Sequence, residues 1–198
     1  MEQSRGDYRR RKIYRRTLHH NILRETLGPT PHAKRNIVHV ATNTAFNLMI
    51  DDFMLQHIQE ATEQEARRQL QDDSWALSRE ELNAVIAVFY ARGAFGANNL
   101  AVKDLWNTTW GTPFFRRVTS RDRFQEILRS IRFDVKSTRS ARLQTDKFAL
   151  ASHTWNRFID NCQIFYRPGE NIDVDEQLFP TKVRCKWTQY IASKPDKF

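Results

Sequence analysis

Apolar residues recur at intervals of three and four along most of residues 46–165, and this helical spacing constrains the fold more than any other feature. The pattern predicts helices that bury one face, separated by short breaks. A short helix and a packed turn are expected between residues 102 and 115. The longer expected helices span about 46–70, 78–93, 119–131 and 148–167. The fold class expected is therefore mainly α.

Local signals indicate where two of these helices begin. Ser78 and Glu81 have capping-box spacing before the apolar run LNAVIAVFYAR, which is typical of a buried helix ending at Gly93. Thr119 or Ser120 is expected to cap the following long helix. The tryptophans are expected to anchor the core rather than to stack on nucleobases. The residues expected in the core include Trp106, Trp110, Phe114, Phe124, Ile127, Leu128, Ile131 and Cys162.

After Pro168-Gly169 the spacing changes from helical to alternating. Between Asn171 and Leu178, aliphatic residues alternate with polar ones that include Asp173 and Asp175, which is the pattern of a strand. A second strand is expected at about 184–191, paired with the first as a hairpin. Because two strands alone are marginally stable, the hairpin is expected to pack on the helices or to begin a larger sheet.

The formal charge of +9 is unevenly distributed along the 198 residues. Residues 1–35 hold 10 basic and 3 acidic residues, and residues 92–148 hold 12 and 5. Between these basic blocks, residues 51–81 hold 3 basic and 9 acidic residues. An acidic segment repels phosphate, so any contact with DNA is expected to avoid residues 51–81.

Both basic blocks are candidates for contact with duplex DNA. Folded basic surface supplies affinity for DNA through phosphate neutralisation and counterion release. The first cluster also has the density of a nuclear-localisation signal, although a solvated tail has the same composition. Likewise, the second cluster is either a DNA-binding face or an ordinary solvated helix face. The candidate residues are Arg9, Arg10, Arg11 and Lys12 in the first block and Arg116, Arg117, Arg121, Arg123, Arg129 and Arg132 in the second.

Several classes of protein are disfavoured by what the sequence lacks. The uncharged run 36–50 is too short and too polar to span a membrane, so no membrane association is expected. The charged N-terminal residues do not resemble a signal peptide. Two cysteines are too few for a disulfide framework or a four-cysteine zinc site, and they favour a reducing compartment. The sequence contains no nucleotide-binding glycine motif and no nucleophile elbow.

Several short motifs follow one another in a fixed order near the end of the chain. They are Asp175-Glu176-Gln177, Arg184-Cys185, Tyr190-Ile191 and Lys194-Pro195-Asp196-Lys197-Phe198. With the upstream run TSRDRFQEILRSIRFD, they resemble the piggyBac family of DDE transposases. The resemblance covers roughly residues 46–198 and leaves out the basic arm before them.

The resemblance implies a helical dimerisation and DNA-binding region followed by an RNase H-like catalytic domain. It implies that Asp175 is the first of three metal-binding catalytic aspartates, which in an intact family member hold Mg²⁺. Two-metal chemistry on phosphodiesters requires several converging carboxylates. The other two family aspartates would lie on later strands, which the 198 residues do not include. The chain is therefore expected to be a truncated, inactive portion of a transposase without a cofactor of its own.

These observations divide the chain into a basic, flexible arm (1–43), a helical dimerisation and DNA-binding-like region (44–168) and an incomplete RNase H-like start (169–198). The first functional hypothesis is a transposase-derived, nuclear DNA-binding protein that is catalytically inactive, with a second copy of the chain as a candidate partner. A second hypothesis is a portion of an active enzyme that transposes DNA at TTAA sites with Mg²⁺. A third is a helical protein-interaction module, whose acidic segment faces a partner or the chain's own basic surface.

Overall fold

The computed structural model describes residues 26–37, 42–169 and 171–173. In these residues helices dominate, which confirms the mainly α class. The elements in chain order are β1 (Gly28–Pro29), α1 (Pro31–Asn36), α2 (Thr42–Met49), α3 (Asp52–Leu70), α4 (Arg79–Ala94), α5 (Val102–Leu105), α6 (Pro113–Val118), α7 (Arg121–Ser130), α8 (Lys136–Arg142), α9 (Ser152–Phe165) and β2 (Tyr166–Arg167).

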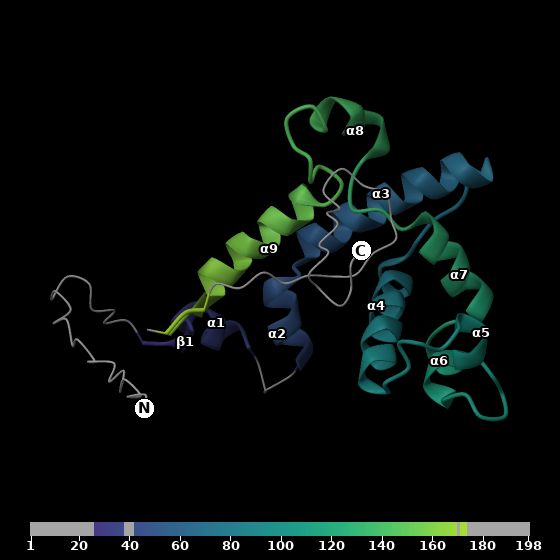
Figure 1. The fold of residues 1–198 in the computed structure, drawn as a ribbon, viewed down its shortest axis with the longest axis horizontal. Coiled ribbons are helices and arrows are strands. Elements are labelled where there is room, and N and C mark those ends of the chain that lie inside the picture. The colour runs from purple at the N-terminus through teal and green to yellow at the C-terminus, as the bar shows by residue number, and fades with distance from the viewer. Residues whose placement is uncertain (1–25, 38–41, 170, 174–198) are drawn as a thin grey trace, which may run out of the picture.

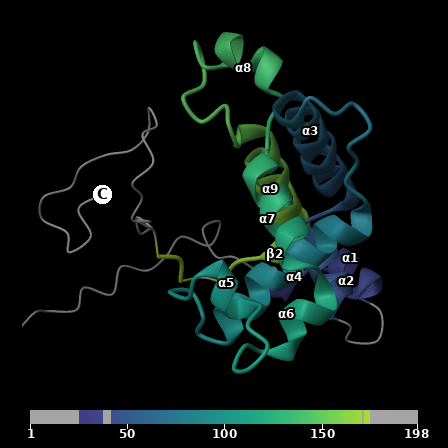
Figure 2. The same cartoon turned by 90° about the vertical axis from the view of Figure 1, so that its right-hand side faces the viewer.

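The long helix α3 packs against both α4 and α7, and α6 packs against α4 (Figure 1). At the other side of the molecule, α9 lies against α1 and α2. The views agree that α8 lies at one end of the molecule and that α5 and α6 lie at the opposite end (Figures 1 and 2). The two ends therefore present separate surfaces.

The core lies between α3, α4, α6 and α7. Trp106 contacts the rings of Phe115 and Phe124, with centroid distances of 5.6 and 5.1 Å. Its indole Nε1 donates a hydrogen bond to the Thr119 carbonyl (2.9 Å), so the polar atom of this buried ring is satisfied. Leu128 and Ile131 pack at the edge of the core. The buried residues of this cluster include Leu55, Ile58, Trp75, Leu77, Leu82, Val85, Val88, Leu105, Trp106, Phe115, Phe124 and Ile127.

The two expected helix caps are present. Ser78 and Glu81 form a reciprocal capping box at the start of α4, and Ser120 caps α7 by accepting a hydrogen bond from the Arg123 N–H. These caps depend on residues three positions apart, which explains why the sequence alone revealed them.

The single helix expected over 46–70 is wrong, because the chain forms two helices there. The side chain of Asp51 accepts a hydrogen bond from the Met54 N–H and so begins α3 as its N-cap. The same carboxylate contacts Arg157 at 2.7 Å and Asn161 at 3.1 Å on α9. The break at Asp51 thus also joins α3 to α9.

Part of the expected arm is folded, which corrects the flexible arm proposed over residues 1–43. Pro31 occupies the first turn of α1, where it needs no hydrogen-bond donor, and Thr30 is the N-cap. The Thr30 hydroxyl also donates to the Ile164 carbonyl (3.1 Å), and β1 pairs antiparallel with β2. The Gly-Pro-Thr-Pro sequence therefore starts a helix instead of only interrupting one.

Two further expectations concern the end of the chain and Trp110. The hairpin expected over 171–191 lies almost entirely outside the described residues, and the β1–β2 pairing is a separate feature. Trp110 was expected in the core, but its side chain is 59% exposed. Cys162 is half-buried and contacts the Met49 sulfur at 3.8 Å, and burial raises the pKa of its thiol.

Candidate nucleic-acid interface

The six arginines predicted to bind DNA lie on α6, on α7 and just after α7, but the structure divides them into two groups. Arg123 and Arg132 are held by carboxylates within the fold. The others are exposed, and among the described residues the side chains of Arg117 and Arg129 make no hydrogen bond or ion pair. Two of the six predicted DNA-binding arginines are therefore paired with carboxylates inside the fold. The exposed members are Arg116, Arg117, Arg121 and Arg129.

Arg123 connects α7 to the start of α4. Its guanidinium contacts Glu81 at 2.7 Å and Glu126 at 2.8 Å, and it donates to the Ala76 carbonyl at 2.6 Å. The same group lies over the Trp75 ring, 4.7 Å from its centroid. The hydrogen bond with Glu81 raises the pKa of Arg123. All of these contacts hold Arg123 within the fold.

Arg132 is held by Glu65, a buried residue of α3. The two side chains meet at 3.0 Å, and Glu65 also accepts hydrogen bonds from Arg68 and Gln69. Lys136 approaches the same carboxylate at 3.5 Å. The hydrogen bond from Arg68 lowers the pKa of Glu65 most strongly, and it outweighs the opposing effect of burial. Glu65 is therefore ionised and neutralises several of the chain's own cations.

Asp134 forms a second buried centre and is not among the residues predicted from the sequence. It contacts Arg139 through two hydrogen bonds of 2.6 and 3.0 Å, and Arg142 through one of 2.7 Å. Burial alone would raise the pKa of Asp134, but the hydrogen bonds from the two arginines lower it overall. The sequence signal that could have indicated this centre is Asp134 followed by basic residues at three-residue intervals, at Lys136, Arg139 and Arg142.

Acid is expected to destabilise the fold through these two carboxylates. Glu65 and Asp134 have pKa values below their ordinary 4.5 and 3.8, so they bind fewer protons in the folded chain than in the unfolded chain. Their stabilisation is complete above those ordinary values and is lost progressively as the pH falls from them toward the lowered pKa values. The urea midpoint of unfolding, followed by circular dichroism, should fall steeply between about pH 5 and pH 3. A midpoint that does not change over this interval would contradict the assignment.

Four of the nine acidic residues in segment 51–81 pair with the chain's own basic residues. Besides Glu65, Asp51 pairs with Arg157, Glu63 with Arg67 and Glu81 with Arg123. These pairs are internal to the described fold, and Arg67 belongs to the acidic segment itself. The acidic residues therefore determine which arginines stay available.

Among the six predicted arginines, the available positive charge lies mainly at α6. Arg116 and Arg117 are exposed, and Arg116 donates to the Asn107 carbonyl at 2.8 Å, which leaves its positive charge without a carboxylate. Within the described ranges, the Arg121 side chain pairs only with the exposed Asp122. Arg129 is less favourable, because it lines a shallow pocket with Asp72, Asp122 and Glu126. The end of the molecule formed by α5 and α6 is thus the best candidate for contact with phosphates.

The remaining predicted residues lie outside the described residues. These are Asp175, the predicted catalytic and metal-binding residue, and Arg9, Arg10, Arg11 and Lys12. Asp173 is described and is exposed. Among residues 26–37, 42–169 and 171–173, no three histidine, cysteine, aspartate or glutamate side chains converge as a metal site requires. Nor does any helix in these ranges have the length and apolar character to cross a membrane.

Comparisons with known proteins agree with the helical arrangement. A family model described as Transposase IS4 matches residues 42–198. The fold is similar to that of a piggyBac transposase, solved by cryo-electron microscopy as a synaptic complex with hairpin DNA. The TM-score is 0.79 at 26% sequence identity, and the match covers 87% of this chain and 36% of the transposase. The chain thus spans about a third of the length of that protein. No curated protein matches the sequence.

Proposed function

The chain belongs to the Transposase IS4 family of DDE transposases as a piggyBac-type member, and on this premise we propose that it binds duplex DNA through the α5–α6 end of the helical region. The observation that carries the proposal is the pair Arg116 and Arg117, which are exposed and not neutralised by carboxylates of the described residues. The similar transposase was solved bound to DNA, which supports the same class of ligand. A nuclear location is part of the proposal.

The physical basis of binding is the neutralisation of phosphates. Each phosphate contact by a lysine or arginine releases counterions from the DNA, so the affinity falls steeply as salt rises. Such contacts carry no sequence information, because the phosphate groups are the same at every base pair. The α5–α6 end is therefore proposed to supply affinity and orientation on the duplex rather than choice of sequence.

We also propose that the 198-residue chain binds DNA without cleaving it. In an intact member, divalent metal ions would activate the attacking oxygen and stabilise the leaving oxygen. Asp175 is the one residue that the family resemblance assigns to such a site, and the described residues bring no further carboxylates together as a metal centre. Nicking of DNA by this chain in Mg²⁺, abolished by Asp175→Ala, would overturn this part of the proposal and favour the active-enzyme hypothesis.

The double substitution Arg116→Gln with Arg117→Gln tests the proposed surface. Binding of a fluorescein-labelled blunt duplex is followed by anisotropy over a salt series. Each phosphate contact contributes about −0.9 to the slope of log K against log salt. The double variant should therefore have a shallower slope, smaller in magnitude by about two. At low salt its affinity should fall at least about tenfold.

A matched control removes the same charge at a distant surface. Lys34→Gln with Arg35→Gln changes two exposed residues of α1, on the opposite side of the molecule from α6 (Figure 1). This variant should keep the salt slope and affinity of the unaltered chain. Substitution of Arg9, Arg10, Arg11 and Lys12 by glutamine measures the contribution of the first block. If the unaltered chain has no affinity for duplex at low salt, or if only the first-block variant loses it, the proposed surface is wrong.

A further inference from the structure

Trp110 is an exposed tryptophan in an otherwise polar turn. Its side chain is 59% exposed, whereas Trp106, four residues earlier, is buried in the core. The residues around it in the turn are Asn107, Thr108, Thr109, Gly111 and Thr112. An apolar docking surface for a protein would require further apolar side chains beside the indole, and the turn supplies none.

The backbone that carries Trp110 is fixed by several contacts. The Asn107 side chain accepts hydrogen bonds from the N–H groups of Thr109 (2.8 Å) and Trp110 (3.2 Å). The Asn107 carbonyl accepts from Arg116 of α6 at 2.8 Å. A Cβ at Gly111 would lie 2.9 Å from the Asn107 nitrogen and also from the Leu105 carbonyl oxygen, so only glycine fits there without a shift. The exposed indole is therefore held on a rigid turn.

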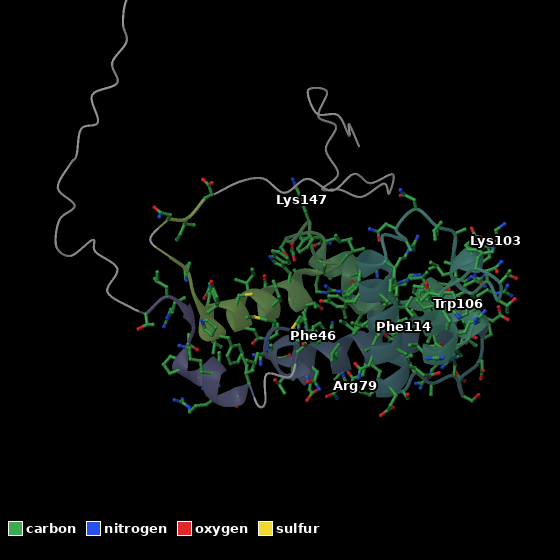
Figure 3. The ribbon with its side chains drawn as sticks, turned by 90° about the horizontal axis from the view of Figure 1, so that it is seen from below. Phe46, Arg79, Lys103, Trp106, Phe114 and Lys147 are labelled. Atoms are coloured by element: carbon green, nitrogen blue, oxygen red, sulfur yellow. The ribbon has the colours of Figure 1, made fainter. Side chains whose placement is uncertain are left out.

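The surroundings of the turn are positively charged. Residues 101–121 contain Lys103, Arg116, Arg117 and Arg121 against the single acidic residue Asp104. Figure 3 shows Lys103 and Trp106 at the same end of the molecule. Arg116 binds the turn directly, so at least one positive charge adjoins the segment that carries the indole. A rigid, flat aromatic surface within a basic region suits a nucleic acid better than an apolar protein partner.

We propose that Trp110 is a stacking surface for an unpaired nucleobase, with Arg116 and Arg117 on the phosphates beside it. This inference rests on the proposed DNA-binding function and specifies the structure of the DNA that is bound. Every base has an aromatic face, so stacking on an indole tolerates any sequence. In an intact duplex the base faces are covered by neighbouring pairs. The turn therefore favours DNA that presents an unpaired base, such as a single-stranded end.

The test compares two labelled DNA molecules that share one duplex, one blunt and one with a five-nucleotide single-stranded overhang. The unaltered chain should bind the overhang DNA more tightly than the blunt duplex. Trp110→Ala should weaken binding of the overhang DNA by about tenfold and leave blunt-duplex affinity and the salt slope unchanged. Trp110→Phe should keep most of the preference. With 2-aminopurine in the overhang, the unaltered chain should quench its fluorescence and Trp110→Ala should not.

Trp155→Ala is the matched control, because Trp155 on α9 is also exposed, at 51%. This variant should bind both DNA molecules like the unaltered chain, and circular dichroism should show that all variants keep the helical fold. If Trp110→Ala binds the overhang DNA and the blunt duplex with the same affinities as the unaltered chain does, the stacking role is wrong. Duplex binding would then be unaffected. Absence of binding to either DNA would overturn both proposals. A change from dimer to monomer on Trp110→Ala, seen by sedimentation, would instead assign the indole to a second copy of the chain.

Discussion

Replacement of Phe124 by alanine is expected to lower the free energy of unfolding by about 4 kcal/mol. Phe124 is 2% exposed and packs between Trp106 and Phe89, with ring centroid distances of 5.1 and 6.0 Å. The substitution removes a buried aromatic ring and leaves a cavity that rigid neighbours from α4 and α5 fill only in part. Chemical denaturation in urea, followed by circular dichroism at neutral pH, measures the change.

The matched control is Phe133→Ala, at an exposed phenylalanine just after α7. It should change the free energy of unfolding by less than about 1 kcal/mol, because its ring already contacts solvent. A loss below about 1 kcal/mol for Phe124→Ala would contradict the packing described for the core. The two variants together show whether α7 is held by its apolar face.

Replacement of Asp134 by asparagine is expected to cost about 2 to 3 kcal/mol of unfolding free energy. The carboxylate is 2% exposed and faces the guanidinium groups of Arg139 and Arg142. Asparagine keeps the shape but removes the negative charge, and it places an N–H₂ donor opposite groups that only donate. Two partly buried cations then lose their counterion. The stability loss should appear in the same urea titration.

Asp122→Asn serves as the control for this substitution. Asp122 also pairs with an arginine, Arg121, but its side chain is 80% exposed. An ion pair in solvent contributes little, so the control should change stability by less than about 0.5 kcal/mol. If the two variants lose equal stability, the buried centre at Asp134 does not hold the loop and helix α8 in place.

The internal ion pairs also bear on the proposed DNA surface. Some arginines that a count of basic residues would make available to DNA are neutralised inside the fold, by Glu65, Glu81 and Asp134. The number of arginines in the helical region therefore overstates the basic surface that is available to DNA. Of the six predicted arginines, Arg116 and Arg117 on α6 are exposed and have no carboxylate partner in the described part of the chain. The proposed interface is smaller and better defined than the sequence suggested.

The features that the sequence alone determined are local ones. Helical periodicity and caps arise from residues three or four positions apart, so the mainly α class, the capping box at Ser78 and the cap at Ser120 could be predicted. The family resemblance also rested on short, contiguous motifs near Asp175. Such signals can be recognised in the sequence because each depends on residues that are close together along the chain.

Tertiary structure alone decided which charges are free and which segments are joined. Arg123 meets Glu81 across 42 residues, Arg132 meets Glu65 across 67, and Thr30 meets Ile164 across 134. Spacing in the sequence carries no signal for contacts of this range. Whether an arginine stabilises the fold or is available to bind DNA depends on whether packing places a carboxylate beside it. An ion pair within the fold neutralises the positive charge that would otherwise attract a phosphate.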